Sequence, residues 1–335
     1  METAVVGRTT LPGFVDLQVN GFVGVDFTDA DLTAEAFRKA CRTLLSRGTA
    51  AFLPTVITAP LDRLERNLAL MAEVSDEDEF AGRLLGFHVE GPFISPVPGA
   101  VGAHDVDSVR SPSVEAFVRL QAAAGGKIRL VTIAAEIPGA ERFARQVEAA
   151  GVTVSLGHQM AGQGDLQRLV AAGATALTHL GNGLPETIHR HHNPIWEGLA
   201  NDDLTVMMIA DGHHLPESML RVYLRAKGVD KIVVVSDAAP IAGFPPGTYE
   251  TLGNTVVLEP SGLLRSPEKG CMVGSSATML DCMNHLASLD VLDLDGLRRV
   301  GFANPLALIG LTAADVDTTD TLRYDAVGRR FELRG

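Results

Sequence analysis

A series of short apolar runs, each followed by a helical pattern or a Gly/Pro-rich loop, most constrains what this chain can fold into. Such alternation indicates parallel strands joined by crossover helices. The runs are hydrophobic almost throughout rather than at every second position, which is typical of strands buried on both faces. We therefore predict an α/β fold, a (β/α)8 barrel with strands at 14–19, 50–57, 84–89, 129–134, 152–156, 174–180, 205–210 and 231–236.

The pattern changes after the eighth predicted strand. Residues 240–272 are rich in proline and glycine and predict a loop or hairpin excursion before a helix near Ser275. The final residues read as exposed strands, so we expect the two chain ends to pair into a small β appendage. The predicted domains are a catalytic barrel at 11–312, including the excursion, and a reduced accessory β segment at 1–10 and 313–335.

Composition excludes several classes of partner and location. The chain has 28 lysines and arginines against 41 acidic residues, a net charge of −13, so we expect neither nucleic-acid nor membrane binding. Three cysteines are too few for a disulfide framework and fit free thiols in a reducing compartment. The amino terminus lacks a basic region followed by an apolar stretch, and no apolar run is long enough to span a membrane. We expect a cytoplasmic protein.

Unusual polar residues fall at the carboxyl ends of the predicted strands. In a barrel these ends form one rim, where residues distant in sequence converge on a pocket. Buried imidazoles and carboxylates are costly unless paired or metal-bound, which favours a functional reason for this repeated placement. The residues are Gln18, Asn20, His88, Glu90, Glu136, His158, His179, Asp211, His213, His214 and Asp237.

Three of these residues predict a metal site. Glu90, His158 and His179 supply one carboxylate and two imidazoles, a ligand set typical of catalytic zinc, although iron, cobalt or manganese would also fit. Gln18 and Asn20 occupy a possible vestigial second-metal position, but amides are weaker ligands, so we expect one ion. Such an ion lowers the pKa of a bound water toward about 7.

Other polar residues are candidates for proton transfer and substrate binding. Asp237, after a very apolar strand, is placed to accept a proton from water and deliver it to a departing amine. His104 and His214 are candidate donors to a carbonyl oxygen or a substrate hydroxyl. The cluster 189–192, His-Arg-His-His, is either an anion clamp or an exposed loop.

Together the motifs resemble those of a known family. LPGFVDLQVNG, FHVEGPF, GAHD, VTIAAE, VSLGHQMA, THLGNGLP, IADGHHLP, VVVSDAAPIAG and GSSATML occur in the order and approximate spacing of the N-acetylglucosamine-6-phosphate deacetylases of the amidohydrolase superfamily. The resemblance implies a metal-dependent TIM-type barrel that hydrolyses the acetamide of an amino sugar phosphate, usually as a homodimer. The short amino-terminal segment implies a reduced accessory domain.

The resemblance also implies residue roles. The metal ligands fall on Glu90, His158 and His179, and the catalytic aspartate on Asp237. The histidine that contacts the substrate carbonyl falls on His104, and Gln18 matches the glutamine that replaces a metal-binding histidine of other superfamily members. Substrate recognition falls on Asn182, Gly183, Arg190 and His214.

Two alternatives stay open at this point. The segment between Glu90 and His104 lacks the expected basic residues, and the text around Arg190 departs from the usual glycine-rich segment. These departures allow a deacylase of an unphosphorylated N-acyl amino sugar or another small acylated amine. A non-catalytic sugar-phosphate binding protein is the other alternative, and retention of the metal and proton-transfer residues argues against it.

Overall fold

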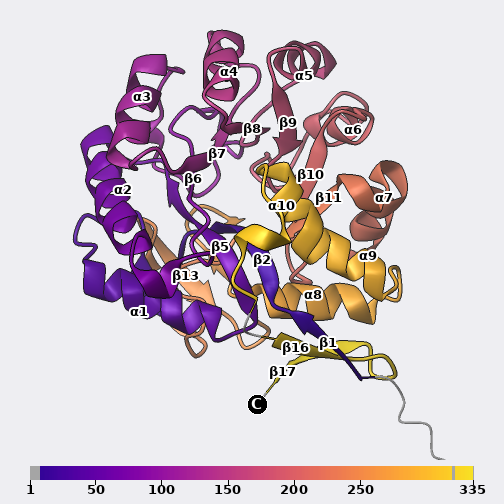
Figure 1. Ribbon diagram of the computed structural model, residues 1–335. Helices are drawn as coiled ribbons and strands as arrows, with labels where there is room; N and C mark the ends of the chain where they lie inside the picture. The colour runs from indigo at the N-terminus through magenta and orange to yellow at the C-terminus, as the bar shows by residue number, and fades with distance from the viewer. Residues whose placement is uncertain (1–7, 319–320, 335) are drawn as a thin grey trace, which may run out of the picture.

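The computed structural model describes residues 8–318 and 321–334 of the chain, and its centre is a parallel β-barrel (Figure 1). Eight strands form one sheet in the order β11-β10-β9-β8-β7-β6-β5-β2. All eight predicted strands and the α/β barrel class are confirmed, with strand ends that differ from prediction by up to three residues. The strands are β2 (Phe14–Val19), β5 (Thr49–Ile57), β6 (Phe87–Glu90), β7 (Ile128–Ile133), β8 (Thr153–Leu156), β9 (Ala174–Leu177), β10 (Thr205–Ile209) and β11 (Ile232–Val235).

Helices surround the barrel on its outer face (Figure 1). In α1 the Thr33 side chain caps the first turn by accepting a hydrogen bond from Ala36 N at 3.2 Å, and Phe37 and Leu44 bury one face. This apolar face of α1 therefore packs against the barrel, including β5. The helices are α1 (Ala34–Leu45), α2 (Leu61–Ser75), α3 (Val114–Ala123), α4 (Ala140–Ala149), α5 (Gln163–Val170), α6 (Pro194–Leu199), α7 (Glu217–Lys227), α8 (Met279–Ser288), α9 (Leu294–Arg298) and α10 (Asn304–Leu308).

The barrel closes between β11 and β2, the two ends of the strand order, without a continuous backbone ladder. Among the described residues the closure consists of an isolated parallel bridge between Val19 and Ala238, with Asn20 N donating to Ala238 O at 2.8 Å. This seam lies at the carboxyl ends of both strands. Side chains of the two strands supply further hydrogen bonds there, as described below.

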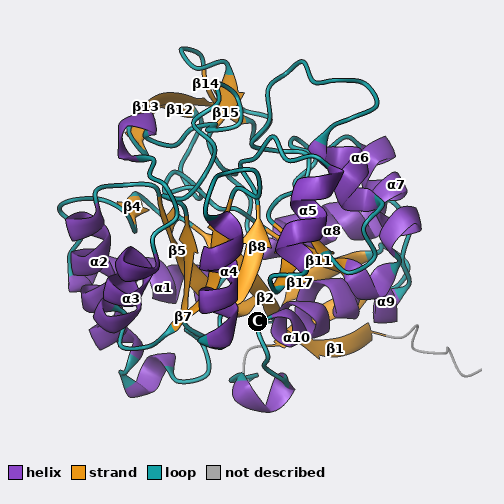
Figure 2. Ribbon diagram, turned by 90° about the horizontal axis from the view of Figure 1, so that it is seen from above, coloured by secondary structure: helices purple, strands orange, loops and turns teal. Residues whose placement is uncertain are grey.

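The excursion at 240–272 is more ordered than the predicted loop or hairpin. It contains a four-stranded antiparallel sheet of β12 (Gly247–Thr251), β13 (Asn254–Leu258), β14 (Leu264–Ser266) and β15 (Cys271–Met272). A small apolar cluster that includes Ile241, Val256 and Leu264 holds it together. Figure 2 shows this sheet beyond the carboxyl ends of the barrel strands, at the opposite end from β1 (Arg8–Pro12).

The two chain ends pair, as predicted. The sheet order is β1-β16-β17, with β16 (Thr321–Asp325) and β17 (Arg330–Leu333), and both pairings are antiparallel. This sheet is fixed to α8 by Asn284, which accepts a hydrogen bond from Phe331 N at 2.6 Å and donates to Phe331 O at 3.1 Å. Residues 1–7 of the predicted accessory segment lie outside the described residues. The division into domains stays a prediction.

Shorter elements complete the described chain. The pair β3 (Gly21–Phe22) and β4 (Val25–Asp26) forms a small antiparallel ladder after β2, and a π-helix covers Arg299–Ala303. Short 3-10 turns occur at Asp78–Phe80, Val106–Ser108, Val229–Lys231 and Ala313–Asp315. Within the described parts of the chain, no helix has the length and apolar character needed to cross a membrane.

The chain-end sheet should contribute strongly to stability through Phe331. Its ring is 1% exposed and meets Phe14 of β2 edge-on at 5.0 Å between centroids. We expect Phe331→Ala to lower the free energy of unfolding by about 3–5 kcal/mol, measured by urea denaturation. Val327→Ala, at a side chain 76% exposed in the turn of the same sheet, is the matched control. A similarly small effect of both substitutions would contradict this packing role.

Candidate active site

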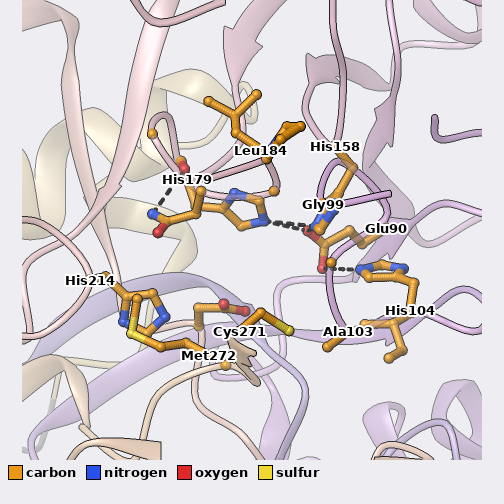
Figure 3. A pocket seen from close by; sticks show the side chains of 18 of the residues that line it. Glu90, Gly99, Ala103, His104, His158, His179, Leu184, His214, Cys271 and Met272 are labelled. Atoms are coloured by element: carbon orange, nitrogen blue, oxygen red, sulfur yellow. Dashed lines mark hydrogen bonds and ion pairs between the residues drawn. The ribbon is translucent and has the colours of Figure 1, made fainter. Parts of the chain in front are cut away.

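The carboxyl ends of the barrel strands surround one cavity. Glu90 is the last residue of β6, and His158, His179 and Asp237 each follow the end of β8, β9 or β11 by two positions. Together with His104, these residues line a cavity of about 360 Å³ (Figure 3). The structure therefore brings together five side chains that the sequence singled out from five separate segments.

Three of these residues have a strained backbone. His158, His179 and Asp237 have φ values of 49°, 30° and 51°, in the left-handed region that non-glycine residues rarely adopt. Such a conformation costs on the order of 1–3 kcal/mol and persists where the surroundings impose it, which occurs often at functional sites. The strain turns each side chain from the end of its strand into the cavity.

Glu90, His158 and His179 direct one donor atom each at a common point. His179 Nε2 lies 2.8 Å from Glu90 Oε1 and 3.1 Å from His158 Nε2, and His158 Nε2 lies 3.4 Å from Glu90 Oε1. Ligand atoms about 2.0–2.2 Å from a tetrahedral zinc ion are separated by about 3.3 Å, so these spacings fit a shared divalent ion.

The hydrogen bond on the other ring nitrogen fixes the role of His158. Its Nδ1 lies 2.8 Å from the carbonyl oxygen of Ala100, which can only accept, so Nδ1 carries the proton. Nε2 then presents a lone pair to the cavity, the state that a metal ligand needs. The donor set thus has the required chemistry as well as the spacing.

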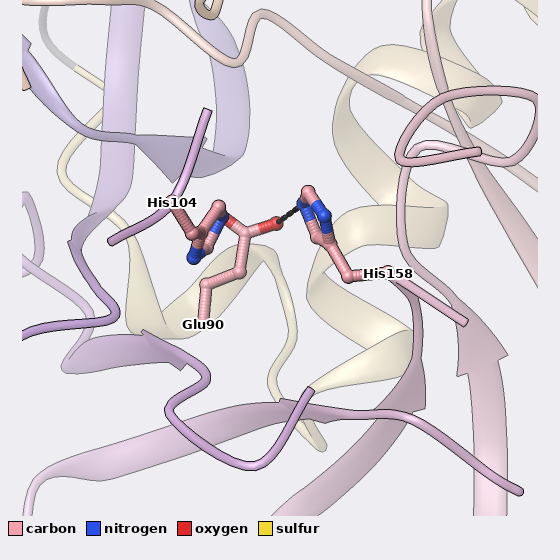
Figure 4. A group of neighbouring side chains, drawn as sticks. All are labelled: Glu90, His104 and His158. Carbon is pink, nitrogen blue, oxygen red and sulfur yellow. Dashed lines mark ion pairs between the residues drawn. The ribbon is translucent and has the colours of Figure 1, made fainter. Parts of the chain in front are cut away.

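His104 is also close to this group (Figure 4). Its Nε2 lies 4.0 Å from Glu90 Oε2, and ligand atoms of Glu90, His104 and His158 lie within 4.8 Å of one another, so this trio is a second possible metal set. His104 Nδ1, however, lies 3.4 Å from Thr58 N, which can only donate, and 2.8 Å from Thr58 Oγ1. An accepting Nδ1 leaves the proton on Nε2, which favours a hydrogen-bond donor over a ligand.

The electrostatics of the group favour an ionised Glu90 and a neutral His104. Burial alone would raise the pKa of Glu90, but hydrogen bonds with His158 and His179 hold it well below its usual value. Burial lowers the pKa of His104 well below its usual value, and the nearby His158 lowers it further. Burial opposes protonation of His179, yet its contact with Glu90 raises its pKa.

Asp237 lies on the other side of the cavity, held by two amides. Its Oδ1 accepts hydrogen bonds from Gln18 Nε2 at 3.0 Å and Asn20 Nδ2 at 2.7 Å. Burial raises the pKa of Asp237, and the charge of Glu90 raises it further. Gln18 and Asn20 thus direct their donor nitrogens at the Asp237 carboxylate.

The remaining predicted binding residues divide into two groups. Asn182, Gly183 and His214 line the cavity, and His214 Nδ1 lies 2.8 Å from Asp211 Oδ2, which fixes the ring. Burial opposes ionisation of Asp211, but this hydrogen bond lowers its pKa. Arg190 is exposed and is not among the residues that line the cavity; its carbonyl oxygen accepts a hydrogen bond from Trp196 Nε1 at 3.1 Å.

Sequence reasoning missed several residues of the site. Cys271 and Met272 of β15 also line the cavity (Figure 3), but they come from the excursion, where no strand pattern predicts placement. Thr58 directs the ring of His104 without any motif of its own. Asp211 was identified at a strand end, although its role as the partner of His214 was not. The sequence ADGHH, which contains Asp211 and His214, was the signal that could have indicated this pairing.

The fold and the site define the class of the protein: a (β/α)8 barrel with a buried carboxylate and histidine group at the carboxyl ends of its strands. The model of the Amidohydrolase family matches residues 9–243. An N-acetylglucosamine-6-phosphate deacetylase of Bos taurus is 35% identical over 318 residues, which cover 91% of this chain and 75% of that protein. The chain therefore belongs to the amidohydrolase family and, within it, to the N-acetylglucosamine-6-phosphate deacetylases.

Solved structures agree with this assignment. N-acetyl-D-glucosamine-6-phosphate deacetylase from Mycobacterium smegmatis superposes with a TM-score of 0.86 at 27% identity, over 98% of this chain and 88% of that one. The N-acetylglucosamine-6-phosphate deacetylase from Thermotoga maritima gives a TM-score of 0.84 at 26% identity, over 97% of this chain and 86% of that one. The similarity thus extends over nearly the whole chain.

The two possible metal sets make different predictions for histidine variants. We expect His179→Ala to lose most of its bound divalent metal, because the ring supplies a converging ligand atom. His104→Ala should retain about one ion per chain, because its Nε2 carries a proton. Metal content measured by mass spectrometry, with the wild-type protein alongside, checks both. Retention in His179→Ala with loss in His104→Ala would instead support the set of Glu90, His104 and His158.

Proposed function

We propose that this chain hydrolyses the acetamide of N-acetylglucosamine 6-phosphate to the free amino sugar phosphate and acetate. Membership of the deacetylase family supports the reaction and substrate. The observation that carries the proposal from this structure is the convergence of Glu90, His158 and His179 opposite Asp237 in one cavity. A ligand group facing a buried carboxylate suits metal-assisted amide hydrolysis.

We propose one divalent ion, most simply Zn²⁺, held by Glu90, His158 and His179. When bound, such an ion would polarise the amide carbonyl and lower the pKa of a water molecule. The one-carboxylate, two-imidazole set supports zinc, and Fe²⁺, Co²⁺ or Mn²⁺ are also compatible with it. The chain's own residues then supply binding and proton transfer.

His104 and Asp237 are the residues that we assign to the reaction itself. His104 Nε2–H donates to the amide oxygen and so stabilises the negative charge that develops there. Asp237 accepts a proton from the attacking water and delivers it to the amine nitrogen as the C–N bond breaks. The amides of Gln18 and Asn20 keep its Oδ1 in a fixed direction during both transfers.

Substrate binding is assigned to other residues that line the cavity. His214, with its ring held by Asp211, and Asn182 and Gly183 are placed to contact the sugar. Gly183 is necessary for close packing at this point, because a Cβ atom there would lie 2.8 Å from His158 Nδ1, and its φ is +61°. We assign Arg190 to the phosphate, which requires it to approach the cavity from the exposed loop or from a second copy of the chain.

We also propose a cytoplasmic homodimer. The dimer follows from the family resemblance, and it would bring a second copy of the exposed Arg190 loop to the assembly. The free thiols Cys41, Cys271 and Cys282 support a reducing compartment. The net charge of −13 supports a small-molecule partner rather than nucleic acid or an anionic membrane.

A deacylase of an unphosphorylated N-acyl amino sugar is the second candidate. The observation that favours it is the lining of the cavity, which contains no lysine or arginine among the described residues. A phosphate bound within this cavity would therefore depend on histidines, backbone N–H groups and any cation brought from outside. The two candidate functions share the same reaction and differ only in whether the substrate carries a phosphate group.

Replacement of Asp237 tests the reaction. We expect Asp237→Asn to retain metal and substrate affinity but to slow turnover by roughly three or more orders of magnitude, since the amide cannot accept the proton. Acetate release from N-acetylglucosamine 6-phosphate, measured with metal content, is the readout. Near-normal turnover in this variant would remove Asp237 as the proton-transfer group, and absent turnover by the wild-type protein would contradict the proposed function.

Replacement of Arg190 tests the phosphate. Charge-assisted contacts are worth roughly 1.5–3 kcal/mol, so Arg190→Ala should raise KM for the phosphorylated sugar by about 10- to 100-fold and leave KM for N-acetylglucosamine nearly unchanged. Both sugars are assayed side by side. Arg299→Ala is the control. Arg299 is also an exposed arginine, lies far from Arg190 in the sequence, and places its Nη1 2.7 Å from Asp230 Oδ1. Equal changes for both sugars would contradict the assignment of Arg190 to the phosphate.

A further inference from the structure

A fully buried carboxylate lies beneath the catalytic centre and has no part in the chemistry described so far. Asp16, in the middle of β2, is 0% exposed, as are Gln18 and Ser236 beside it. The pKa of Asp16 is raised to about 7, because the effect of burial exceeds the opposing effect of hydrogen bonds with Ser236 and Gln18. A carboxyl group buried in a barrel is costly, so its hydrogen bonds need a structural or functional explanation.

The contacts of Asp16 lie across the barrel seam. Its Oδ1 accepts hydrogen bonds from Ser236 N at 3.1 Å and from Gln18 N at 3.2 Å, and its Oδ2 lies 2.5 Å from the Ser236 hydroxyl oxygen. Within the part of the chain that the structure describes, β11 and β2 form no continuous ladder at this seam, and the bridge of Val19 to Ala238 lies just beyond β11. The side chain of Asp16 thus supplies acceptors where a neighbouring strand would otherwise supply backbone carbonyls.

Ser236, which Asp16 holds, directly precedes Asp237. The Ser236 hydroxyl also accepts a hydrogen bond from Ala238 N at 3.1 Å, so one side chain joins the residues before and after Asp237. Ala238 O accepts from Asn20 N at 2.8 Å on the far side. Asp237, with its φ of 51°, is therefore fixed at both of its peptide neighbours.

We infer that Asp16 is a positioning residue for the reaction: through the Ser236 hydroxyl and backbone it imposes the strained conformation that directs the Asp237 carboxylate at the amides of Gln18 and Asn20. This inference rests on the proposed function. Its chain of contacts runs from Asp16 to Ser236 to Asp237, and it does not include Glu90, His158 or His179. The metal ligands should therefore be unaffected by changes at the seam.

This role predicts a selective loss of turnover. A misplacement of about 1 Å in a reacting group can cost about 100-fold in rate, so Asp16→Ala should lower kcat about 30- to 100-fold with KM and metal content near their wild-type values. Asp16→Asn should restore most of that loss. Its amide oxygen accepts from the two backbone N–H groups and its amide nitrogen donates to the Ser236 oxygen.

Ser236→Ala provides the independent test. It removes the hydroxyl between Asp16 and Ala238 and should lower kcat about 10-fold. The double variant Asp16→Ala/Ser236→Ala should be no slower than Asp16→Ala alone, because the two side chains act through one set of contacts. Ser155→Ala is the matched control: it removes another buried barrel hydroxyl, 2.6 Å from Thr178 Oγ1, and should leave kcat within about twofold.

The experiment measures acetate release from N-acetylglucosamine 6-phosphate, bound metal and thermal unfolding for the wild-type protein and each variant. Unchanged kcat in Asp16→Ala, loss of metal together with activity, or additive losses in the double variant would each overturn the positioning role. If Asp16→Ala does not fold, Ser236→Ala decides, and a kcat equal to that of Ser155→Ala overturns it. Absent turnover by the wild-type protein would overturn the proposed function itself, whereas normal wild-type turnover with unaffected variants would overturn only this inference.

Discussion

Closure of eight parallel strands into a barrel is the constraint on which the rest of the structure depends. Closure places every strand's carboxyl end on one rim, so that Glu90 of β6 and the residues after β8, β9 and β11 meet within hydrogen-bonding distance. The apolar strand interiors provide the stability that tolerates costly features at the rim. The positive φ values of His158, His179 and Asp237 and their burial are features of this kind.

Closure is also the least regular part of the barrel. Between β11 and β2 the backbone ladder is nearly absent, and buried side chains take over part of its role. The segment that follows β11 carries Asp237. Gln18 of β2 and Asn20, just after β2, supply the two amides that donate to Asp237 Oδ1. If Asp237 is the proton-transfer group, as proposed, structure and reaction are coupled at the seam, because the hydrogen bonds that close the barrel there also hold the residues beside Asp237.

The sequence predicts the barrel well, since strands buried on both faces are apolar almost throughout and β2, β7 and β11 stand out in the text. It also predicts which strand-end residues meet, because parallel strands bring their carboxyl ends together. The features that the sequence does not predict lie in, or depend on, the loops. The sheet of β12–β15, the Cys271 and Met272 side of the cavity and the distance of Arg190 from it depend on long connections without periodicity.

Tautomers are a further limit on sequence-based prediction. His104 and His158 are equivalent as letters, and both lie next to Glu90. The structure separates them by the partner of Nδ1: a backbone N–H for His104 and a backbone carbonyl for His158. One ring therefore presents a proton to the cavity and the other a lone pair. No spacing rule contains this information, because Thr58 and Ala100 lie in the segments that happen to pass beside each ring.

The charges of the buried side chains give a physical reason for a metal ion in the cavity. Glu90 and Asp237 are buried carboxyl groups that line the same cavity, and no described lysine or arginine lines it to compensate them. Burial raises the pKa of Asp237, and the charge of Glu90 raises it further. In the proposed site, a divalent cation between Glu90 and the two imidazoles would supply the missing positive charge, and it would favour the ionised form of Asp237 that a base requires. The proposed ion would thus both activate water and keep Asp237 ionised, which gives a physical reason for the proposed ligands and Asp237 to share one cavity.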